Sequence, residues 1–246
     1  MFEEFAHGAR CLFGGFTWLT RPGVKRHVFI PLIINSILFI AAIAIGAHYF
    51  SAWLHHWTAA MPGWLAWLAS LLWLIFAAAA AVVLFYGFTL VANIIGAPFD
   101  IFLSMRVEAM LTGRRPETGR SLAADIGVAM RGQVQRLVYI LWRTLLIGIL
   151  GLLLLFVPLF GAVTPLLWFL FTAWMLAILY SDFPLGNRGV TFASQRQLFR
   201  QHRARLFGFG TATALCTMIP VVNFIIMPVA VAGATIMWVE LQPRNP

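Results

Sequence analysis

The chain has 246 residues, of which 61% are hydrophobic and only 10% are charged. A soluble globular domain carries about 25% charged residues, so this composition excludes an ordinary soluble protein. The net charge of +9 comes almost entirely from arginine, since Lys25 is the only lysine. In a soluble protein that balance would suggest nucleic-acid binding. Here the arginines lie outside the apolar runs, where membrane orientation and anionic lipid explain them better, and we expect no nucleic-acid partner.

Residues 1–21 are expected to form an amphipathic helix, because apolar side chains recur there among polar ones. These side chains are Phe2, Phe5, Leu12, Phe13, Phe16, Trp18 and Leu19. Such a helix can lie in the membrane interface or pack on the rest of the protein, and the sequence leaves both possibilities open. After a short basic stretch, residues 27–51 carry no charge and are long enough to span a membrane.

The longest uncharged run extends from Trp64 to Phe99. As one helix it would be about 54 Å long, whereas the hydrocarbon core of a bilayer is about 30 Å thick. The helix must therefore project beyond the bilayer or break, and Pro98 offers a place for a break. We predict a long transmembrane helix with a cytoplasmic extension over residues 64–108.

The distribution of arginine predicts the orientation. The loop 51–63 contains no lysine or arginine, whereas the N-terminal segment, segments 100–136 and 182–205 and the tail all contain arginine. The positive-inside rule then places the loop 51–63 outside and both termini in the cytoplasm.

Two polar segments are expected at the cytoplasmic surface. In the first, 109–143, residues 111–116 have the features of a helix stop, and residues 122–139 have those of an amphipathic, arginine-rich helix. In the second, 182–205, a basic amphipathic helix is expected from residue 194 onward, and contact with anionic lipid headgroups is its preferred interpretation. Its arginines are Arg196, Arg200, Arg203 and Arg205.

Two further apolar regions, 144–181 and 206–239, are divided by proline. Each half has roughly 12 to 17 residues, at or below the usual spanning length. Both regions begin and end beside cytoplasmic arginines, so two short spans or a hairpin that penetrates partway would satisfy the charge rule. The uncharged tips favour partly penetrating, re-entrant hairpins, whose backbone must be covered by protein or line water. We therefore predict a single all-α membrane domain over residues 1–246 that forms a homo-oligomer.

Catalytic motifs are absent from the sequence: it has no His-Glu-x-x-His pair, nucleophile elbow or Walker loop. Cys11 and Cys216 give neither a disulfide framework nor a metal-ligand spacing. We therefore expect no enzyme, no metal and no cofactor.

Polar residues inside the membrane are the better indication of function, because they are costly there. At 100° per residue, one stripe of the long helix holds the side chains of Thr89, Asn93, Ala97, Asp100, Ser104 and Glu108. The stripe fits a water-lined path or interhelical hydrogen bonding, and both remain open. Arg106 falls on the opposite face and is expected to pair with another segment or to act as a gate. Asn35 and Asn223 are expected to join helices first and to line a pore second.

The segment Pro22-Gly23-Val24-Lys25-Arg26 precedes the first predicted span. Free backbone N–H groups and the positive end of the helix dipole make such a position an anion site. Gly23 allows close approach of the backbone, and Lys25 and Arg26 add charge. On pattern alone, an ordinary cationic anchor of a cytoplasmic helix start explains the segment better.

The chain resembles the CysZ family of bacterial inner-membrane sulfate permeases from about Phe13 to Val239. The most specific stretches are WLAWLASLLW (64–73), ANIIGAPF (92–99) with EAMLTG (108–113), LWFLFTAWMLAI (167–178) running to DFP (182–184), and TMIPVVNFIIMPVAVAGAT (217–235). Matches of this length in four separate places do not arise from hydrophobic bias alone.

The resemblance implies an all-helical, oligomeric protomer with two long spanning helices and two partly penetrating hairpins. It also implies sulfate uptake into the cytoplasm for cysteine biosynthesis, without ATP or a bound cofactor, and it makes the outside loop periplasmic. Family members are expected to hold sulfate at a Gly-x-Arg turn, which here is Gly23-Val24-Lys25 followed by Arg26. Lysine keeps the charge but not the bidentate geometry, so Arg26 is expected to contribute most.

The remaining polar candidates would line or gate the path: Asn35, Asn93, Asp100, Arg106, Glu108 and Asn223. Carboxylates beside an anion path require neutralisation, and we expect it from Arg106 or from an arginine in 114–143. The competing hypothesis is a membrane-structural or regulatory protein without transport activity, whose basic helices bind anionic lipid or a cytoplasmic partner.

Overall fold

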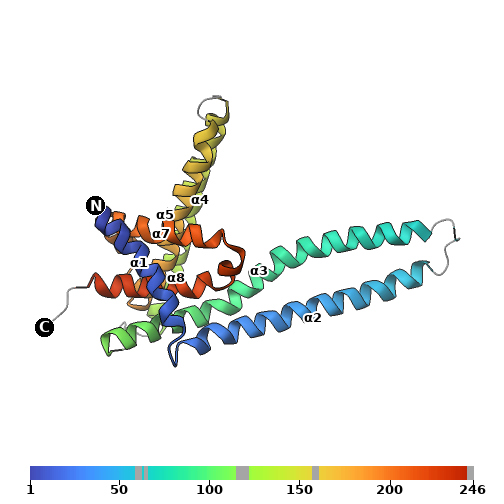
Figure 1. Ribbon diagram of the computed structural model, residues 1–246, viewed down its shortest axis with the longest axis horizontal. Helices are drawn as coiled ribbons and strands as arrows, with labels where there is room; N and C mark the ends of the chain where they lie inside the picture. Colours follow the sequence, from blue (N-terminus) through green and yellow to red (C-terminus); the bar gives the residue numbers. More distant parts are fainter. Residues whose placement is uncertain (59–62, 64–65, 115–121, 157–160, 243–246) are drawn as a thin grey trace. The chain divides into compact units, whose positions relative to one another are not determined.

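The computed structural model describes residues 1–58, 63, 66–114, 122–156 and 161–242, and over these residues it contains helices and no strands. The elements are α1 (Phe2–Leu19), α2 (Lys25–Thr58), α3 (Ala66–Thr112), α4 (Leu122–Leu155), the 3-10 helix η2 (Gly161–Val163), α5 (Thr164–Asn187), α6 (Phe192–Gln201), α7 (Arg203–Thr217) and α8 (Pro220–Glu240) (Figure 1). The predicted all-α class is confirmed. The chain forms two compact units, one of Met1–Val28 with Asp100–Pro246 and one of Phe29–Phe99.

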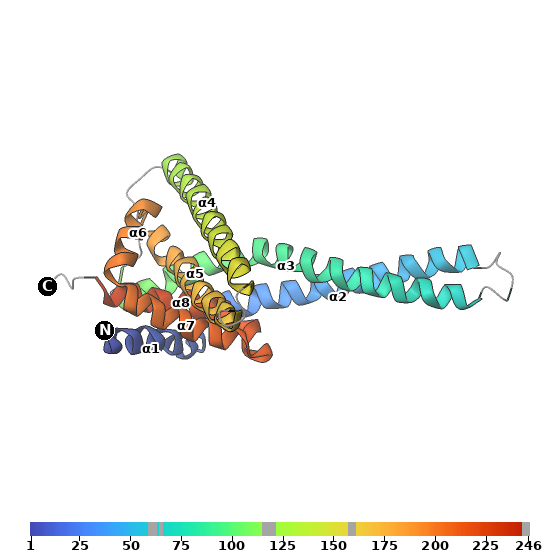
Figure 2. The same ribbon diagram turned by 90° about the horizontal axis from the view of Figure 1, so that it is seen from above.

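The second unit is an antiparallel pair made by α2 and α3 (Figures 1 and 2). Phe50 of α2 contacts α3, with ring centroids 3.7 Å from Phe76 and 4.9 Å from Trp73. Many other apolar side chains of α2 are exposed, such as Ile37 and Ile40, which are 61% and 66% exposed. A helix that is apolar on all sides and exposed is suited to lipid rather than water.

The long helices exceed the thickness of a bilayer. α3 has 47 residues, or about 70 Å. It continues through Pro98, so the break that the sequence offered there does not occur and the helix is simply long. α2 continues to Thr58, beyond the expected end at residue 51, because no proline or glycine interrupts residues 51–58.

In the first unit, α1 packs along α7 and α8, and the three helices lie side by side (Figures 1 and 2). Glycines make this close packing possible: a Cβ at Gly8 would collide with the carbonyl oxygen of Arg205, and one at Gly15 with that of Val229. Residues 2–19 thus pack on the protein, and a position in the membrane interface stays a prediction. The opposite face of α1 keeps Phe2 and Phe13 exposed, at 83% and 55%.

Three helices have the length and apolarity to cross a membrane, within the described residues: Lys25–His56, Val134–Leu154 and Thr164–Asn187. They confirm the membrane class of the protein. The stretch in α4 has 21 residues, longer than the 12 to 17 expected for each half of a hairpin. α4 begins at Leu122 and runs through Arg136 and Arg143 without interruption, so the expected boundary at 143/144 lies inside a helix.

The second basic segment also differs in detail from its prediction. α5 continues through Pro184 to Asn187. α6 then begins at Phe192 and is capped by Thr191, whose hydroxyl accepts a hydrogen bond from the Ser194 N–H at 3.4 Å. His202 has non-helical backbone angles and separates α6 from α7. The single basic helix expected from residue 194 onward is therefore two helices. In contrast, the predicted stop after Thr112 is confirmed, because Gly113 has φ +74° and ends α3.

Candidate anion-binding site

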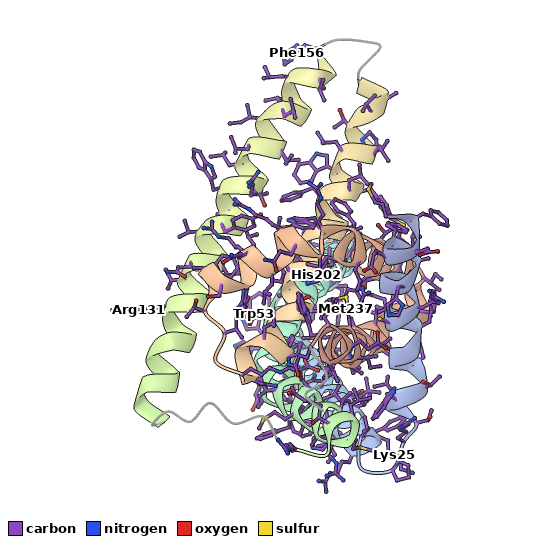
Figure 3. All side chains as sticks on the ribbon, turned by 90° about the vertical axis from the view of Figure 1, so that its left-hand side faces the viewer. Lys25, Trp53, Arg131, Phe156, His202 and Met237 are labelled. Carbon is purple, nitrogen blue, oxygen red and sulfur yellow. The ribbon has the colours of Figure 1, made fainter. Side chains whose placement is uncertain are left out.

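The turn before α2 is built by the sequence Arg21-Pro22-Gly23-Val24. The carbonyl of Arg21 accepts a hydrogen bond from the Val24 N–H at 3.1 Å. Proline fixes the second residue of the turn, and Gly23 has φ +86°, which the third residue of a type II turn requires. Val24 is fully buried and anchors the turn, after which α2 begins at Lys25, labelled in Figure 3.

The first turn of α2 leaves a backbone donor available. Backbone carbonyls of this turn accept hydrogen bonds from the N–H groups of Val24, Lys25 and His27, but not from that of Arg26. Unpaired N–H groups at a helix start, together with the helix dipole, favour an anion. Of the free backbone N–H groups expected at this segment, the structure leaves that of Arg26.

A cavity of about 200 Å³ opens beside this turn, between the start of α2 and the last turns of α3. Arg26 and His27 line it from α2 and Arg106 lines it from α3, whereas Lys25 is not among its lining residues. The guanidinium of Arg106 packs on the turn, and a Cβ at Gly23 would stand 3.2 Å from its Nη2 atom. Gly23 thus provides both the backbone conformation and the space that Arg106 occupies.

The cavity is electropositive. Within the described part of the chain, no carboxylate forms an ion pair with Arg26 or Arg106. The His27 ring lies beside the turn, and its Nδ1 atom is buried. Two guanidinium groups around one hollow are suited to a small oxyanion.

The opposite face of α3 is buried. Asp100, Ser104 and Glu108 are 6%, 0% and 5% exposed. The Ser104 hydroxyl lies 2.9 Å from that of Thr235 on α8, and Nε of Arg188 donates to Oε1 of Glu108 at 2.8 Å. In the structure, this part of the predicted stripe makes interhelical contacts.

The neutralisation of Glu108 differs from our expectation, because its partner is Arg188 rather than Arg106 or an arginine of 114–143. One arginine from that range, Arg136, does pair with a carboxylate, but the carboxylate is Asp182. Its oxygen also accepts from the Gln195 amide at 3.0 Å, which ties α4, α5 and α6 together.

The three asparagine candidates belong to α2, α3 and α8. Asn35 lies in α2 within the second unit, is half-buried, and has an Oδ1 atom without a hydrogen-bond partner. Asn93 belongs to the helical backbone of the same unit, and its side chain lies outside the described part of the structure. Asn223 is exposed in the first turn of α8.

One group of side chains has the composition of a metal site. Ligand atoms of His7, Cys11 and Glu240 lie within 4.8 Å of one another. His7 Nε2 is 2.6 Å from the Glu240 carboxylate, and the Cys11 thiol donates to the same oxygen at 3.7 Å. Burial and the nearby carboxylate raise the pKa of Cys11 to about 12, so the thiol stays protonated. Hydrogen bonding explains this group without a metal.

Comparison with known proteins relates most of the chain to one family. A family model for "Sulfate transporter CysZ/Etoposide-induced protein 2.4" matches residues 11–228. The chain belongs to this family. It is 39% identical over 236 residues to the sulfate transporter CysZ of Pectobacterium atrosepticum, a match that covers 95% of this chain and 84% of that protein. The CysZ proteins of Salmonella typhimurium and Vibrio cholerae are 41% and 38% identical over 229 and 239 residues, covering 92% and 94% of this chain and 89% and 94% of theirs.

In this member of the CysZ family, the Gly23 turn was predicted from the sequence, whereas the cavity beside it was not. Helical projection placed Arg106 opposite the polar stripe, where it was expected to pair with another segment or, if the helix kinked at Pro98, to act as a gate. Arg106 does lie on the face opposite Asp100, Ser104 and Glu108. What the projection could not show is that this opposite face meets the Gly23 turn. His27 was overlooked, although its place one residue after Arg26 was visible in the sequence.

Proposed function

We propose that the protein transports sulfate across the bacterial inner membrane into the cytoplasm for cysteine biosynthesis, without ATP hydrolysis. The observation that carries the proposal is the cavity at the Gly23 turn, where Arg26 and Arg106 meet without a carboxylate partner in the described residues. Several relatives at 38–41% identity are named sulfate transporters, which supports sulfate as the anion.

In this proposal, sulfate is held by the turn and by the two arginines. The Arg26 N–H and the positive end of α2 face one part of the anion, and the guanidinium groups of Arg26 and Arg106 supply charge-assisted hydrogen bonds. Gly23 and Val24 shape the turn, and Lys25 adds charge at longer range. Asn35, Asn93, Asp100, Glu108 and Asn223 remain candidates for residues along the path.

The proposed topology places both termini in the cytoplasm and the 51–63 loop in the periplasm. The turn then lies at the cytoplasmic end of α2. We further propose that the α4–α5 and α7–α8 pairs enter the membrane only partway and that protomers assemble into a homo-oligomer. The exposed apolar surfaces of α2 and α3 support assembly, because a second copy or lipid must cover them.

The competing hypothesis, a structural or regulatory membrane protein without transport, is not favoured, because the relatives are named transporters. The same names fit a protein that is not an enzyme. Contact of the basic helices with anionic lipid is compatible with transport and is no longer needed as a separate function.

The decisive test is uptake of radiolabelled sulfate into liposomes that contain only the purified protein, without ATP. Saturable uptake is expected in the wild type, and Arg26→Ala is expected to reduce it strongly. Arg131→Ala removes an exposed arginine that lines neither cavity described in this structure, so its uptake should match the wild type.

Either of two results would contradict the proposal. Equal uptake by Arg26→Ala and the wild type would remove the turn from the mechanism. No uptake above empty liposomes, with a folded and oligomeric preparation, would restore the structural or regulatory hypothesis.

A further inference from the structure

A second cavity, of about 270 Å³, lies between α4, α5 and α6. It shares no lining residue with the cavity at the Gly23 turn. Arg143 lines it from α4, and Arg196 and Arg200 line it from α6. We propose that this cavity binds the headgroup of an anionic phospholipid from the surrounding bilayer, with the acyl chains lying along α4 and α5. The inference rests on the membrane location of the protein and is independent of sulfate transport.

The cavity is positively charged and is therefore suited to an anion. No carboxylate lines it, and none forms an ion pair with its three arginines in the described ranges. The neighbouring arginines Arg136 and Arg205 are instead paired, with Asp182 and Glu4. Three guanidinium groups around one hollow repel one another unless a bound anion compensates their charge.

The position of Arg143 is partly fixed before any ligand binds. Its guanidinium carbon lies 5.5 Å from the centroid of the Tyr139 ring, one turn earlier on α4. Tyr139 in turn packs edge-on against Phe192 at the start of α6, with ring centroids 5.8 Å apart. This chain of contacts holds Arg143 on the α6 side of α4, toward Arg196 and Arg200.

The remaining walls favour a lipid over a free anion. The floor of the cavity is apolar and includes Ile147 of α4 and Phe171 and Trp174 of α5. Both helices contain candidate membrane spans, Val134–Leu154 and Thr164–Asn187. A free oxyanion gains nothing from these apolar walls, whereas acyl chains bury apolar surface against them.

The surface next to the cavity is also suited to acyl chains. Trp142, adjacent to Arg143, is 59% exposed, and Leu141 and Leu145 are 66% and 53% exposed. Figure 3 shows α4 and α5 converging toward Phe156 and diverging toward Arg131, and Figure 2 shows α6 beside the diverging part. The cavity therefore lies at the arginine-bearing end of the helix pair, where basic pockets between membrane helices bind anionic lipids.

The experiment measures the binding of fluorescent phosphatidylglycerol and phosphatidylcholine to the full-length protein in neutral detergent. The wild type should bind phosphatidylglycerol more tightly than phosphatidylcholine. Replacement of each cavity arginine by glutamine should weaken phosphatidylglycerol binding roughly fivefold, and R143Q/R196Q/R200Q should weaken it roughly 100-fold. Phosphatidylcholine binding should not change.

A matched control removes the same charge elsewhere. Arg10, Arg131 and Arg203 are exposed and do not line the cavity. R10Q/R131Q/R203Q should keep phosphatidylglycerol affinity within about threefold of the wild type at physiological salt, because distant charges are screened. Should the cavity triple variant fail to fold, the three single variants provide the same comparison at smaller amplitude.

Two outcomes would overturn the assignment. One is that the folded cavity variants prefer phosphatidylglycerol over phosphatidylcholine as strongly as the wild type does. The other is arginine-dependent binding of inorganic phosphate without any preference for phosphatidylglycerol, which would assign the cavity to a free anion. Sulfate uptake by R26A has no bearing on either outcome, so failure of the transport proposal remains distinguishable.

Discussion

The last turns of α3 use charge in two opposite ways. Glu108 is 5% exposed and forms an ion pair with Arg188 at 2.8 Å. Arg106, two residues earlier, is exposed and packs against Gly23 without a carboxylate partner in the described part of the chain. Two residues along a helix correspond to a rotation of about 200°, so these side chains point in nearly opposite directions.

The difference separates charges that hold the fold from charges available to a ligand. A buried charge must be paired because desolvation is costly, so the pair of Glu108 and Arg188 fastens α3 to the end of α5. An exposed arginine costs little to leave unpaired and can exchange its water for an anion. Substitutions on the buried face, which holds Glu108, should therefore lower stability. Substitutions on the exposed face, which holds Arg106, should weaken sulfate binding.

Glu108→Ala should have the largest effect. Removal of one partner of a buried ion pair costs about 3–5 kcal/mol, because the other charge is left buried and unpaired. The side chain of Arg188 is only 16% exposed and has little access to water. Unfolding of the purified protein in detergent should show this loss, and the double variant E108A/R188A should be more stable than E108A. If E108A unfolded like the wild type, the pair of Glu108 and Arg188 would not hold α3 to the end of α5.

Arg106→Ala should have the second largest effect, on binding instead of stability. A hydrogen bond to a charged group contributes about 1.5–3 kcal/mol, so sulfate affinity should fall roughly 10- to 100-fold. Arg106→Lys keeps the charge but not the planar guanidinium group. Its sulfate affinity should therefore lie between those of the wild type and Arg106→Ala. Titration calorimetry with sulfate measures both variants, and their melting temperatures should match that of the wild type. Loss of stability without loss of affinity would place Arg106 with the structural charges.

Gly23→Ala tests the junction of the turn with Arg106. A left-handed conformation costs a residue with a Cβ about 1–2 kcal/mol, and the new Cβ would press on the Arg106 guanidinium, 3.2 Å away. Displacement of that guanidinium, and not the strain itself, should lower sulfate affinity, by less than the roughly 10- to 100-fold expected for Arg106→Ala.

Gly113→Ala is the matched control for that substitution. Gly113 also has positive φ, at +74°, but a Cβ added there would meet no atom within 4 Å, so the variant carries the strain without the contact. It should lower stability and leave sulfate affinity unchanged. Equal loss of affinity in both glycine variants would mean that backbone strain, not the position of Arg106, controls binding.

Local features were predictable from the sequence because their causes are local. Proline followed by glycine specifies the turn at Gly23, glycine after Thr112 specifies the end of α3, and the long uncharged runs specify membrane helices. Helix ends inside basic segments were harder to predict, because arginine is compatible with a helix interior. α4 therefore passes through Arg136 and Arg143 without a boundary.

Partners distant in the sequence could not be predicted. Glu108 and Arg188 are 80 residues apart, and nothing near either residue identifies the other. The helical stripe on α3 correctly grouped Asp100, Ser104 and Glu108, but a polar stripe has the same pattern whether it faces water or another helix. Only the packing of α3 against α8 and the end of α5 shows that this stripe faces other helices and not water.

Ser104→Ala should have the smallest effect and tests that distinction directly. The Thr235 hydroxyl donates to the Val231 carbonyl at 2.8 Å, so the hydrogen bond at 2.9 Å must be donated by Ser104. Its loss should cost about 1 kcal/mol of unfolding free energy, and S104A/T235V should cost little more, because neither polar partner is then left unsatisfied. Sulfate uptake per folded protein should not change, since both side chains are fully buried between helices. Reduced uptake at unchanged stability would instead place Ser104 on the water-lined path, and the buried face of α3 would then serve transport as well as packing.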